Sequence, residues 1–498
     1  MAQAQDVLKQ VFGHDDFRGG QQPAIDALLS GRDALCVMPT GAGKSVCYQV
    51  PALLKSGITL VISPLISLMK DQVAALISAG VPAAYLNSSL TPSQMSTALN
   101  RAASGQYKII YVAPERLQTE SFLAFARDAE ISLIAVDEAH CVSQWGQDFR
   151  PSYTAIPIFI AALPKRPPIG AFTATATLPV RDDIVKLLGL VNPLQLVTGF
   201  DRANLKFEVR KPKSKDEELE GIIRQRPEQC GIIYCQTRRA VETVSANLTL
   251  KGFPCTRYHA GLSDAERRQN QDDFSFDRVK LIAATNAFGM GIDKSNVSFV
   301  VHYNMPKDLE SYYQEAGRAG RDGEKADCIL LYSGKDVHTA KFLIENSNRS
   351  ETVDEKLLPA LVKRDLERLK LMTYYCTVDR CLRVQILSYF GEKDLEECGN
   401  CSHCVPLPRA HKTQPVVLQA FPVDEGLFAH LKEKRLELAK KSGVPAFVIF
   451  SDASLRDMAS KRPTTLDGFS LIAGVGRVKA ERYGFVFVQA IRRYLMDT

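Results

Sequence analysis

Short apolar segments alternate with helix-like segments between residues 34 and 301 of the chain. Each apolar segment has the length of a strand, is rich in Val and Ile, and ends at a turn or a polar motif. Continuous apolar runs of this kind are typical of parallel strands buried on both faces, and their alternation with helices indicates βαβ units. Examples of the predicted strands are residues 34–37, 59–62, 109–112, 131–136, 231–234, 279–283 and 298–301.

The strand pattern restarts after residues 200–212, which predicts two α/β lobes with parallel sheets. From residue 337 to residue 385 the pattern becomes helical. Residues 405–423 are rich in Pro and polar side chains and are typical of a linker. Beyond this linker, residues 425–441 and 485–494 have the pattern of amphipathic helices, so an all-α segment ends the chain.

Composition narrows the class of protein only slightly. The 498 residues are 45% hydrophobic, and 62 basic against 56 acidic residues give a net charge of +6. This mild surplus permits nucleic-acid binding but does not argue for it. The N-terminus has no apolar signal region and no apolar run reaches the roughly 20 residues of a membrane span, so we expect a soluble, cytoplasmic protein. In a reducing compartment, a close group of its twelve cysteines favours a metal site over disulfides.

The strand at residues 34–37 leads into a glycine-containing turn and the start of a helix. Gly41 and Gly43 allow the backbone to approach phosphate oxygens, and the helix N-terminus favours anions. Lys44 would neutralise the β- and γ-phosphates and Ser45 would bind Mg²⁺. Met38 stands where the Walker A pattern has its first glycine, and an ordinary βα turn is the alternative interpretation. The predicted phosphate loop comprises Thr40, Gly41, Ala42, Gly43, Lys44 and Ser45.

Two further motifs carry charges suited to phosphoryl transfer. The apolar strand at 131–136 ends in Asp137 and Glu138, which we assign to Mg²⁺ and to orientation of the attacking water. A helix N-terminus enriched in acids is the alternative interpretation. Arg318 and Arg321 lie three residues apart, and a guanidinium near the transferring phosphoryl group spreads its negative charge. The alternative for this pair is a set of surface salt bridges.

Four late cysteines have the spacing of a metal site. Cys398, Cys401 and Cys404 follow a C-x₂-C-x₂-C pattern, and Cys381 on a preceding helix can supply a fourth thiolate to one tetrahedral Zn²⁺. Unpaired buried cysteines and an iron–sulfur cluster are the alternatives. The fourth ligand stays open at this point, because Cys376 and His403 lie nearby in the sequence.

Taken in order, these motifs resemble those of superfamily 2 helicases, and specifically of the RecQ family. The segment 17–21 is similar to the adenine-reading motif, and the phosphate loop, Asp137–His140 and the segment 314–321 follow in the family order. The most specific match is the segment 140–151, which resembles the aromatic-rich loop that links DNA binding to ATP hydrolysis. The resemblance covers roughly residues 10–405 and resumes near residue 425, where the chain resembles the HRDC domain.

The resemblance implies roles for particular residues. Arg18 and Gln21 would contact adenine, and His14 stands where relatives often carry an aromatic ring. Asp293 would help to close the nucleotide cleft, with Arg321 as the arginine finger and Arg318 in support. The DNA-contacting side chains would be Trp145, Phe149 and Arg150, and Trp145 is the only tryptophan in the chain. The zinc would be structural, because four ligands leave no open position.

The implied architecture is two RecA-like lobes, a helical zinc module and an all-α HRDC bundle. The expected boundaries are 1–205 and 206–336 for the lobes, 337–405 for the zinc module, 406–424 for a linker and 425–498 for the bundle. RecQ relatives usually carry a winged-helix domain between the last two modules. About twenty residues separate them here, which is too few for a folded domain.

The implied function is an ATP- and Mg²⁺-dependent DNA helicase that moves 3′ to 5′ on single-stranded DNA. Its substrates would be tailed or branched duplexes in recombination and repair. We expect a monomer, and a single-stranded-DNA-binding protein is a candidate partner. The alternatives are a translocase with weak unwinding, an RNA helicase of the same superfamily, and a non-enzymatic DNA-binding module.

Overall fold

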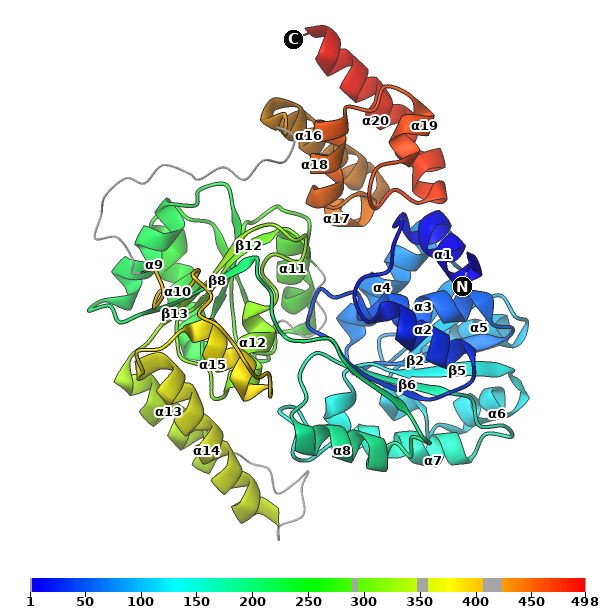
Figure 1. Ribbon diagram of the computed structural model, residues 1–498, viewed down its shortest axis with the longest axis horizontal. Coiled ribbons are helices and arrows are strands. Elements are labelled where there is room, and N and C mark those ends of the chain that lie inside the picture. The colour runs from blue at the N-terminus through cyan, green and yellow to red at the C-terminus, as the bar shows by residue number, and fades with distance from the viewer. Residues whose placement is uncertain (1, 289–293, 347–356, 406–422, 498) are drawn as a thin grey trace. The chain divides into compact units, whose positions relative to one another are not determined.

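The computed structural model describes residues 2–288, 294–346, 357–405 and 423–497. Among these residues, one compact unit contains 2–199 and 423–497, and the other contains 200–288, 294–346 and 357–405 (Figure 1). Each unit is built around its own parallel sheet, as the strand pattern predicts. In the described part of the chain, no helix combines the length and the apolar character needed to cross a membrane.

The first lobe has a seven-stranded parallel sheet in the order β3-β4-β2-β5-β6-β1-β7. Strand β1 pairs with β6 so that Val37 lies opposite Thr173, and β6 pairs with β5 so that Val136 lies opposite Ala171. The carboxyl ends of these three neighbours therefore meet at one edge, where doubly wound sheets bind their ligands. The strands are β1 (Ala34–Val37), β2 (Ile58–Ile62), β3 (Ala83–Leu86), β4 (Ile109–Val112), β5 (Ile131–Val136), β6 (Ile169–Thr173) and β7 (Leu194–Val197).

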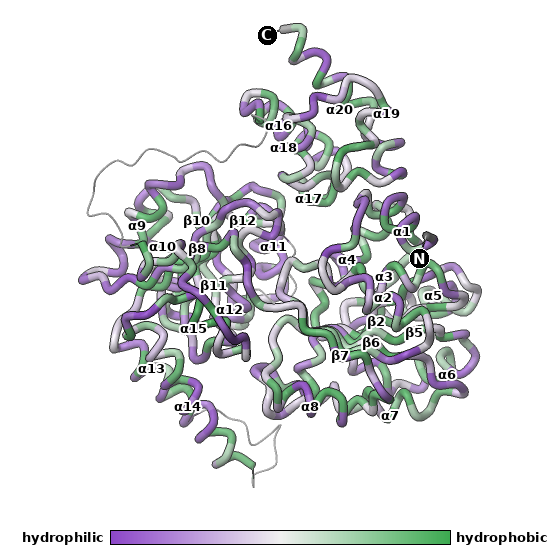
Figure 2. The backbone as a smooth tube through the Cα atoms, in the orientation of Figure 1, coloured by the Kyte–Doolittle hydropathy of each residue, from purple (hydrophilic) through white to green (hydrophobic). Residues whose placement is uncertain are grey.

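Helices pack on both faces of this sheet, and its central strands are almost entirely buried. Figure 2 shows the consequence, since the strands are mainly hydrophobic whereas the helices carry polar stretches. The helices are α1 (Ala2–Val7), α2 (Gln21–Leu29), α3 (Lys44–Leu54), α4 (Ile66–Ser78), α5 (Pro92–Ala103), α6 (Glu120–Asp128), α7 (Ala155–Ala161) and α8 (Leu178–Leu187). Shorter helical turns cover Leu8–Phe12, Pro114–Arg116, Ala139–Val142 and Pro151–Thr154.

The second lobe has a six-stranded parallel sheet in the order β10-β11-β9-β12-β13-β8. Its strands are β8 (Leu205–Arg210), β9 (Cys230–Tyr234), β10 (Cys255–Tyr258), β11 (Leu281–Ala284), β12 (Val297–His302) and β13 (Ala326–Leu331). Its helices are α9 (Lys215–Arg224), α10 (Arg238–Leu250), α11 (Asp264–Ser275) and α12 (Leu309–Ala316). Because α12 directly precedes Arg318 and Arg321, the position of this helix decides where the two arginines lie.

The zinc module continues the second unit as three helices and a cysteine-rich loop. The helices are α13 (Gly334–Glu345), α14 (Leu358–Thr377) and α15 (Leu382–Tyr389). The loop attaches to the edge strand β8, where Ser402 N donates to Phe207 O at 3.0 Å and Val209 N donates to Ser402 Oγ at 3.2 Å. The module thereby occupies backbone groups at an edge that would otherwise stay open.

The C-terminal segment is an all-α bundle, as predicted. Its helices are α16 (Glu425–Ser442), α17 (Ala446–Ile449), α18 (Asp452–Lys461), α19 (Leu466–Ser470) and α20 (Arg477–Asp497). A compact core forms around Phe450, which makes edge-to-face contacts with Phe469, Tyr483 and Phe487. The predicted linker lies almost wholly outside the described residues.

Candidate nucleotide-binding site and zinc centre

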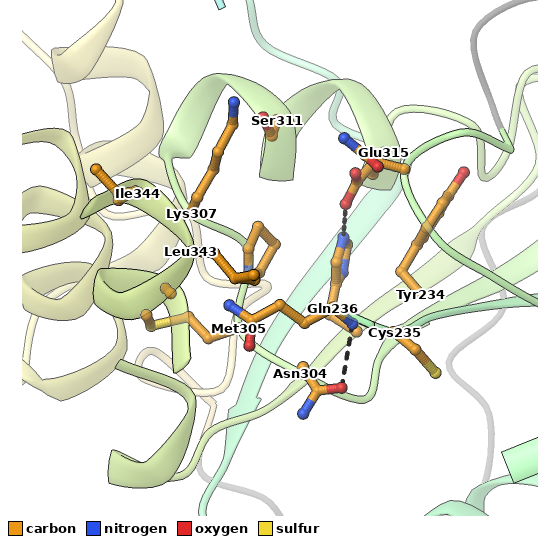
Figure 3. Close-up of a pocket in the computed structure, with 14 residues that line it drawn as sticks. Tyr234, Cys235, Gln236, Asn304, Met305, Lys307, Ser311, Glu315, Leu343 and Ile344 are labelled. Carbon is orange, nitrogen blue, oxygen red and sulfur yellow. Dashed lines mark hydrogen bonds and ion pairs between the residues drawn. The ribbon is translucent and has the colours of Figure 1, made fainter. Parts of the chain in front are cut away.

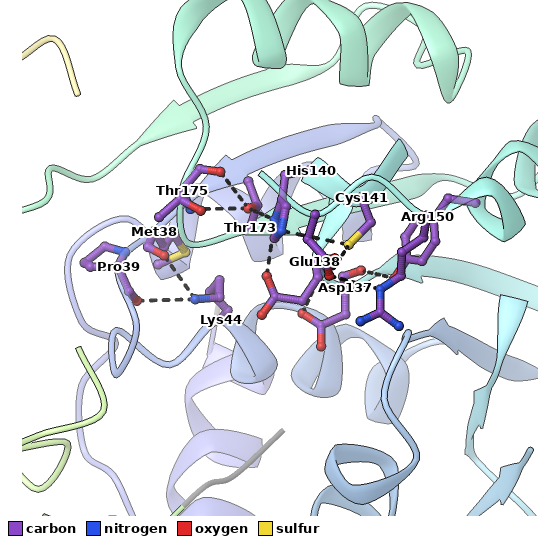
Figure 4. Close-up of polar contacts among 12 residues, drawn as sticks. Met38, Pro39, Lys44, Asp137, Glu138, His140, Cys141, Arg150, Thr173 and Thr175 are labelled. Atoms are coloured by element: carbon purple, nitrogen blue, oxygen red, sulfur yellow. Dashed lines mark hydrogen bonds and ion pairs between the residues drawn. The ribbon is translucent and has the colours of Figure 1, made fainter. Parts of the chain in front are cut away.

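The predicted phosphate loop joins β1 to α3 and has the backbone of an anion site. Gly41 and Gly43 have φ values of +86° and +78°, a region that favours glycine. A Cβ atom on Gly43 would lie 2.5 Å from Gln21 Nε2, so a larger residue would also displace that side chain. Lys44 Nζ donates to Met38 O at 3.1 Å and to Pro39 O at 3.4 Å, so its ammonium group folds back onto the loop that precedes α3 (Figure 4).

The predicted adenine-reading residues contact this same loop. Gln21 Nε2 donates to the carbonyls of Ala42 and Gly43 at 3.0 and 3.1 Å, and Arg18 Nη1 donates to Gly41 O at 3.1 Å. Gln21 also accepts from Arg18 N at 2.8 Å. The structure therefore joins the predicted adenine-reading segment to the predicted phosphate loop, a link that residue types alone do not reveal.

His14 precedes this segment and is half-buried. Burial lowers the pKa of His14, and the positive charges of Arg18 and Lys479 lower it further against the effect of Asp15. A neutral imidazole is thus favoured at this position, and a neutral ring can stack on a base without repelling Arg18.

The acidic pair follows β5 at the edge where β1 and β6 also end. Asp137 is 8% exposed, and Tyr153 holds its carbonyl with a hydroxyl hydrogen bond of 2.8 Å. Burial and the neighbouring Glu138 raise the pKa of Asp137 to about 7, while Lys44 acts in the opposite direction. A buried carboxylate that resists ionisation gains strongly from a divalent cation, and Ser45 and Asp137 are the oxygen donors that suit Mg²⁺ here.

Glu138 adopts a strained backbone conformation and belongs to a buried network. Its φ of +46° lies in the left-handed region, which is rare for a non-glycine residue and frequent at functional sites. Its Oε2 lies 3.4 Å from His140 Nδ1, and that nitrogen lies 2.8 Å from Thr173 Oγ1. Thr173 Oγ1 in turn donates to Thr175 O at 3.2 Å, so one chain of contacts joins the ends of β5 and β6 (Figure 4).

The aromatic loop carries the predicted DNA contacts. Trp145 is 41% exposed, which is unusual for an aromatic ring of this size and leaves a face for stacking. Phe149 is half-buried. Arg150 donates to Asp148 at 3.0 Å and to Pro64 O at 3.1 Å, so its guanidinium braces the loop against the segment that follows β2.

The two predicted arginines follow α12 in the second lobe. Arg318 is 5% exposed, which argues against a surface salt-bridge pair. It hydrogen-bonds the Tyr234 hydroxyl at the end of β9. The third predicted residue of this lobe, Asp293, lies outside the described residues.

The four predicted cysteines converge. Their sulfur atoms all lie within 4.8 Å of one another, with Cys401 Sγ at 3.9 Å from Cys381 Sγ and at 3.6 Å from Cys404 Sγ. A tetrahedral zinc with bonds of about 2.3 Å separates its sulfurs by about 3.8 Å, so the spacing fits one ion. Burial opposes ionisation of Cys401, but backbone N–H groups of Cys404, Leu382 and His403 outweigh it and lower the pKa of this thiol to about 7.

The two nearby candidates for the fourth ligand, His403 and Cys376, do not belong to this group of four. His403 Nδ1 lies 2.7 Å from an Asp379 oxygen, and this partner raises the pKa of the imidazole. Cys376 is buried on α14 outside the four-sulfur group.

Tyr153 is a residue at the edge of the first sheet that the sequence did not suggest. Its hydrogen bond to Asp137 joins two residues that are 16 positions apart, so no local motif reveals it.

Four families of known domains match consecutive parts of the chain. They are the DEAD/DEAH box helicase domain over residues 18–184, the helicase conserved C-terminal domain over 214–323, the RecQ zinc-binding domain over 334–405 and the HRDC domain over 424–491. Their order is that of the two lobes, the cysteine loop and the C-terminal bundle.

Full-length relatives match the whole chain. An ATP-dependent DNA helicase RecQ of Bacillus subtilis is 38% identical over 99% of both chains, and one of Pasteurella multocida is 35% identical over 99% of this chain and 94% of its own. The first alignment spans 595 positions, more than the 498 residues of this chain, so that relative contains segments absent here. A solved structure described as the DEAD-box helicase Mss116 bound to ssRNA and UDP-BeF has a TM-score of 0.55 at 18% identity, covering 75% of this chain and 86% of its own, which supports the fold alone.

Proposed function

Because the chain belongs to the RecQ family of ATP-dependent DNA helicases, we propose that it uses ATP hydrolysis to move 3′ to 5′ along single-stranded DNA and to separate duplex strands. The observation that carries this proposal is the buried network at one edge of the first sheet. Lys44 begins α3 after β1, whereas Asp137 and Glu138 follow β5. Glu138 Oε2 contacts His140, which in turn contacts Thr173 at the end of β6. Such a network suits a site whose hydrolysis is tied to a conformational change.

In this proposal the phosphate loop holds the nucleotide. Backbone N–H groups from Thr40 to Ser45 and the Lys44 ammonium contact the phosphates, and the Ser45 hydroxyl and Asp137 hold Mg²⁺. Bound Mg²⁺ supplies positive charge to the phosphate oxygens. Glu138 orients the attacking water and accepts its proton, and the strained backbone at this residue fixes the direction of its carboxylate.

The remaining roles complete the catalytic cycle. Gln21 and Arg18 read adenine, and their hydrogen bonds to the phosphate loop tie base recognition to loop conformation. Arg321 stabilises the charge that develops on the transferring phosphoryl group, with Arg318 in support, and Asp293 assists closure. The zinc held by the four cysteines is structural.

We propose that single-stranded DNA contacts the aromatic loop through Trp145 and Phe149. Arg150 acts by bracing that loop, since its guanidinium already binds Asp148 and Pro64 O. Aromatic stacking is indifferent to base sequence, which suits a motor that moves along any strand. Tailed or branched duplexes are the proposed substrates, in recombination and repair, with a single-stranded-DNA-binding protein as a candidate partner of a monomeric enzyme.

A translocase with weak unwinding is the second candidate, favoured by one observation. The alignment with the Bacillus subtilis relative is longer than this chain, and about twenty residues separate the zinc module from the bundle. A domain that grips duplex DNA ahead of the motor does not fit in that interval.

The deciding experiment follows ATP hydrolysis and strand separation in one reaction with a labelled duplex. One substrate has a 3′ single-stranded tail, a second has a 5′ tail, and a third has an RNA tail. ATP-dependent separation of the 3′-tailed DNA alone supports the proposal. Hydrolysis stimulated by DNA without strand separation identifies the translocase, and preference for the 5′ tail or for RNA refutes the assigned polarity or substrate.

A further inference from the structure

A cavity of about 300 Å³ opens at the carboxyl edge of the second sheet, wholly within the second lobe and α13. Its polar wall includes Gln236 after β9, Asn304 after β12, and Ser311 and Glu315 on α12 (Figure 3). His302, the last residue of β12, also lines it. The cavity therefore reaches the helix that leads directly to the two arginines.

His302 and Glu315 form a buried pair in this wall. His302 Nε2 lies 3.0 Å from Glu315 Oε2, and the exposed fractions of the two side chains are 0% and 12%. The imidazole is packed between Tyr234, at 5.5 Å between ring centroids, and Tyr312, at 4.8 Å. Its second nitrogen, Nδ1, is buried without a hydrogen-bond partner. The two tyrosine rings thus hold the imidazole in place, and its polar contact is the one that Nε2 makes with Glu315 on α12.

Glu315 lies at the point where α12 ends and the arginine segment begins. Its backbone carbonyl accepts a hydrogen bond from Arg318 N at 3.2 Å, and Gly317 N donates to Tyr313 O at 2.9 Å. The side chain of Arg318 meets Tyr234, the same ring that stacks on His302. Two routes, one through Glu315 and one through Tyr234, therefore connect His302 to Arg318.

A purely structural role accounts poorly for this arrangement. Burying a polar or charged pair costs desolvation free energy, and apolar residues of similar volume often stabilise a fold as well or better. The His302–Glu315 pair lies in the wall of a cavity, and two apolar side chains of similar volume would line that cavity equally well. A hydrogen bond differs from an apolar contact in being directional. The bond from His302 to Glu315 therefore fixes the orientation of the last turn of α12.

We propose that His302 is a positioning residue for ATP hydrolysis, whose hydrogen bond to Glu315 holds the last turn of α12 and thereby sets Arg318 and Arg321. The inference rests on the proposed function in one respect, since it takes these arginines as the ones that act on the transferring phosphoryl group. A small displacement of such a group costs roughly ten- to a hundredfold in rate, without weakening ground-state binding of ATP.

The test uses two substitutions of His302 in the full-length protein. His302→Gln retains an amide nitrogen near the position of Nε2, whereas His302→Asn places its amide near Nδ1 and loses the contact with Glu315. Val301→Ala is the matched control, because Val301 is equally buried on the adjacent position of β12 but belongs to the core on the other side of the strand. Metal content and thermal midpoint are measured for every variant.

The decisive readout compares two ligands. A non-hydrolysable ATP analogue reports ground-state binding, and ADP with aluminium fluoride and Mg²⁺ mimics the transferring phosphoryl group. For His302→Asn we expect kcat and the affinity for ADP–aluminium fluoride to fall about tenfold or more while the analogue binds normally. His302→Gln should restore both, and Val301→Ala should lower the thermal midpoint alone.

Three outcomes would overturn the inference. They are an unchanged kcat in His302→Asn, a lower kcat with unaltered affinity for ADP–aluminium fluoride, and the same selective loss in Val301→Ala. A separate variant, Arg321→Ala, tests the premise. If it hydrolyses ATP normally, the proposed role of the arginine fails, whatever the His302 variants show.

Discussion

Asp137→Asn should stabilise the nucleotide-free protein while abolishing its response to Mg²⁺ and ATP. The carboxyl group is buried beside Glu138, and these two influences raise its pKa from 3.8 to about 7. One pKa unit corresponds to about 1.4 kcal/mol, so ionised Asp137 destabilises the folded state by at most about 4 kcal/mol. The asparagine amide is itself buried at some cost, and we expect a net gain of roughly 1–3 kcal/mol.

The stability difference between Asp137→Asn and the parent protein should depend on pH. The folded-state pKa is raised, so the folded protein binds the Asp137 proton more tightly than the unfolded chain does. The destabilisation is absent below about pH 4, grows between pH 4 and pH 7, and is complete above pH 7. The difference in free energy of unfolding between Asp137→Asn and the parent protein should therefore be maximal at pH 8 and about 3 kcal/mol smaller at pH 4.5, where the burial cost of the amide leaves the variant no more stable than the parent.

Denaturant unfolding at these two pH values, without nucleotide, measures the effect. Glu138→Gln is the matched control, because it removes a charge from the neighbouring residue. At pH 8 with MgATP, the parent and Glu138→Gln should gain stability by ligand binding, whereas Asp137→Asn should gain much less. A variant that is less stable than the parent at pH 8, or a difference that is independent of pH, would refute the reasoning.

Three further substitutions test the other sites. Lys44→Ala should lower ATP hydrolysis by about a hundredfold or more and leave DNA affinity intact, as read from steady-state rates and DNA titration; retained DNA-stimulated hydrolysis would contradict the assignment. Cys401→Ser should lose bound zinc and unfold at a lower temperature, whereas Cys376→Ser should keep its metal, and metal analysis distinguishes them. Trp145→Ala should weaken single-stranded DNA binding by roughly 1–3 kcal/mol with nucleotide affinity unchanged. Since Trp145 is the only tryptophan, quenching of its fluorescence by DNA in the parent protein gives an independent check.

The fold was predictable where strands are continuously apolar. All seven of these predicted strands exist, with bounds that differ by at most two residues, such as β11 at Leu281–Ala284 against the expected 279–283. Two of the strands outside these seven have mixed composition and lie at sheet edges. Strand β7 (Leu194–Val197) alternates between half-buried and exposed side chains at a sheet edge, and β10 (Cys255–Tyr258) contains Thr and Arg at another edge. Edge strands bury less surface, so their sequences carry a weaker signal.

The chemistry of the site was predictable where it depends on residues close in sequence. The phosphate loop and three of the four cysteines are short motifs whose spacing alone brings their atoms together. Cys381 required the fold, because 17 positions separate it from Cys398 and only the packing of α15 decides between it and its rivals. The same distinction applies to Gln21, for which the family resemblance implied a base contact but whose hydrogen bonds to Ala42 and Gly43 depend on the placement of α2 beside α3.

Sequence reasoning missed Tyr153 and His302. Each of them contacts a residue that is distant in the sequence and lies in or next to a predicted catalytic motif. Tyr153 holds the carbonyl of Asp137, and His302 holds Glu315 one turn before Arg318. Both are fully buried, so as isolated positions they are indistinguishable from core residues. Their polar atoms nevertheless point at groups whose position matters to within fractions of an ångström. A substitution that removes only the polar atom, such as Tyr153→Phe, keeps the packing of the ring and isolates its influence on Asp137.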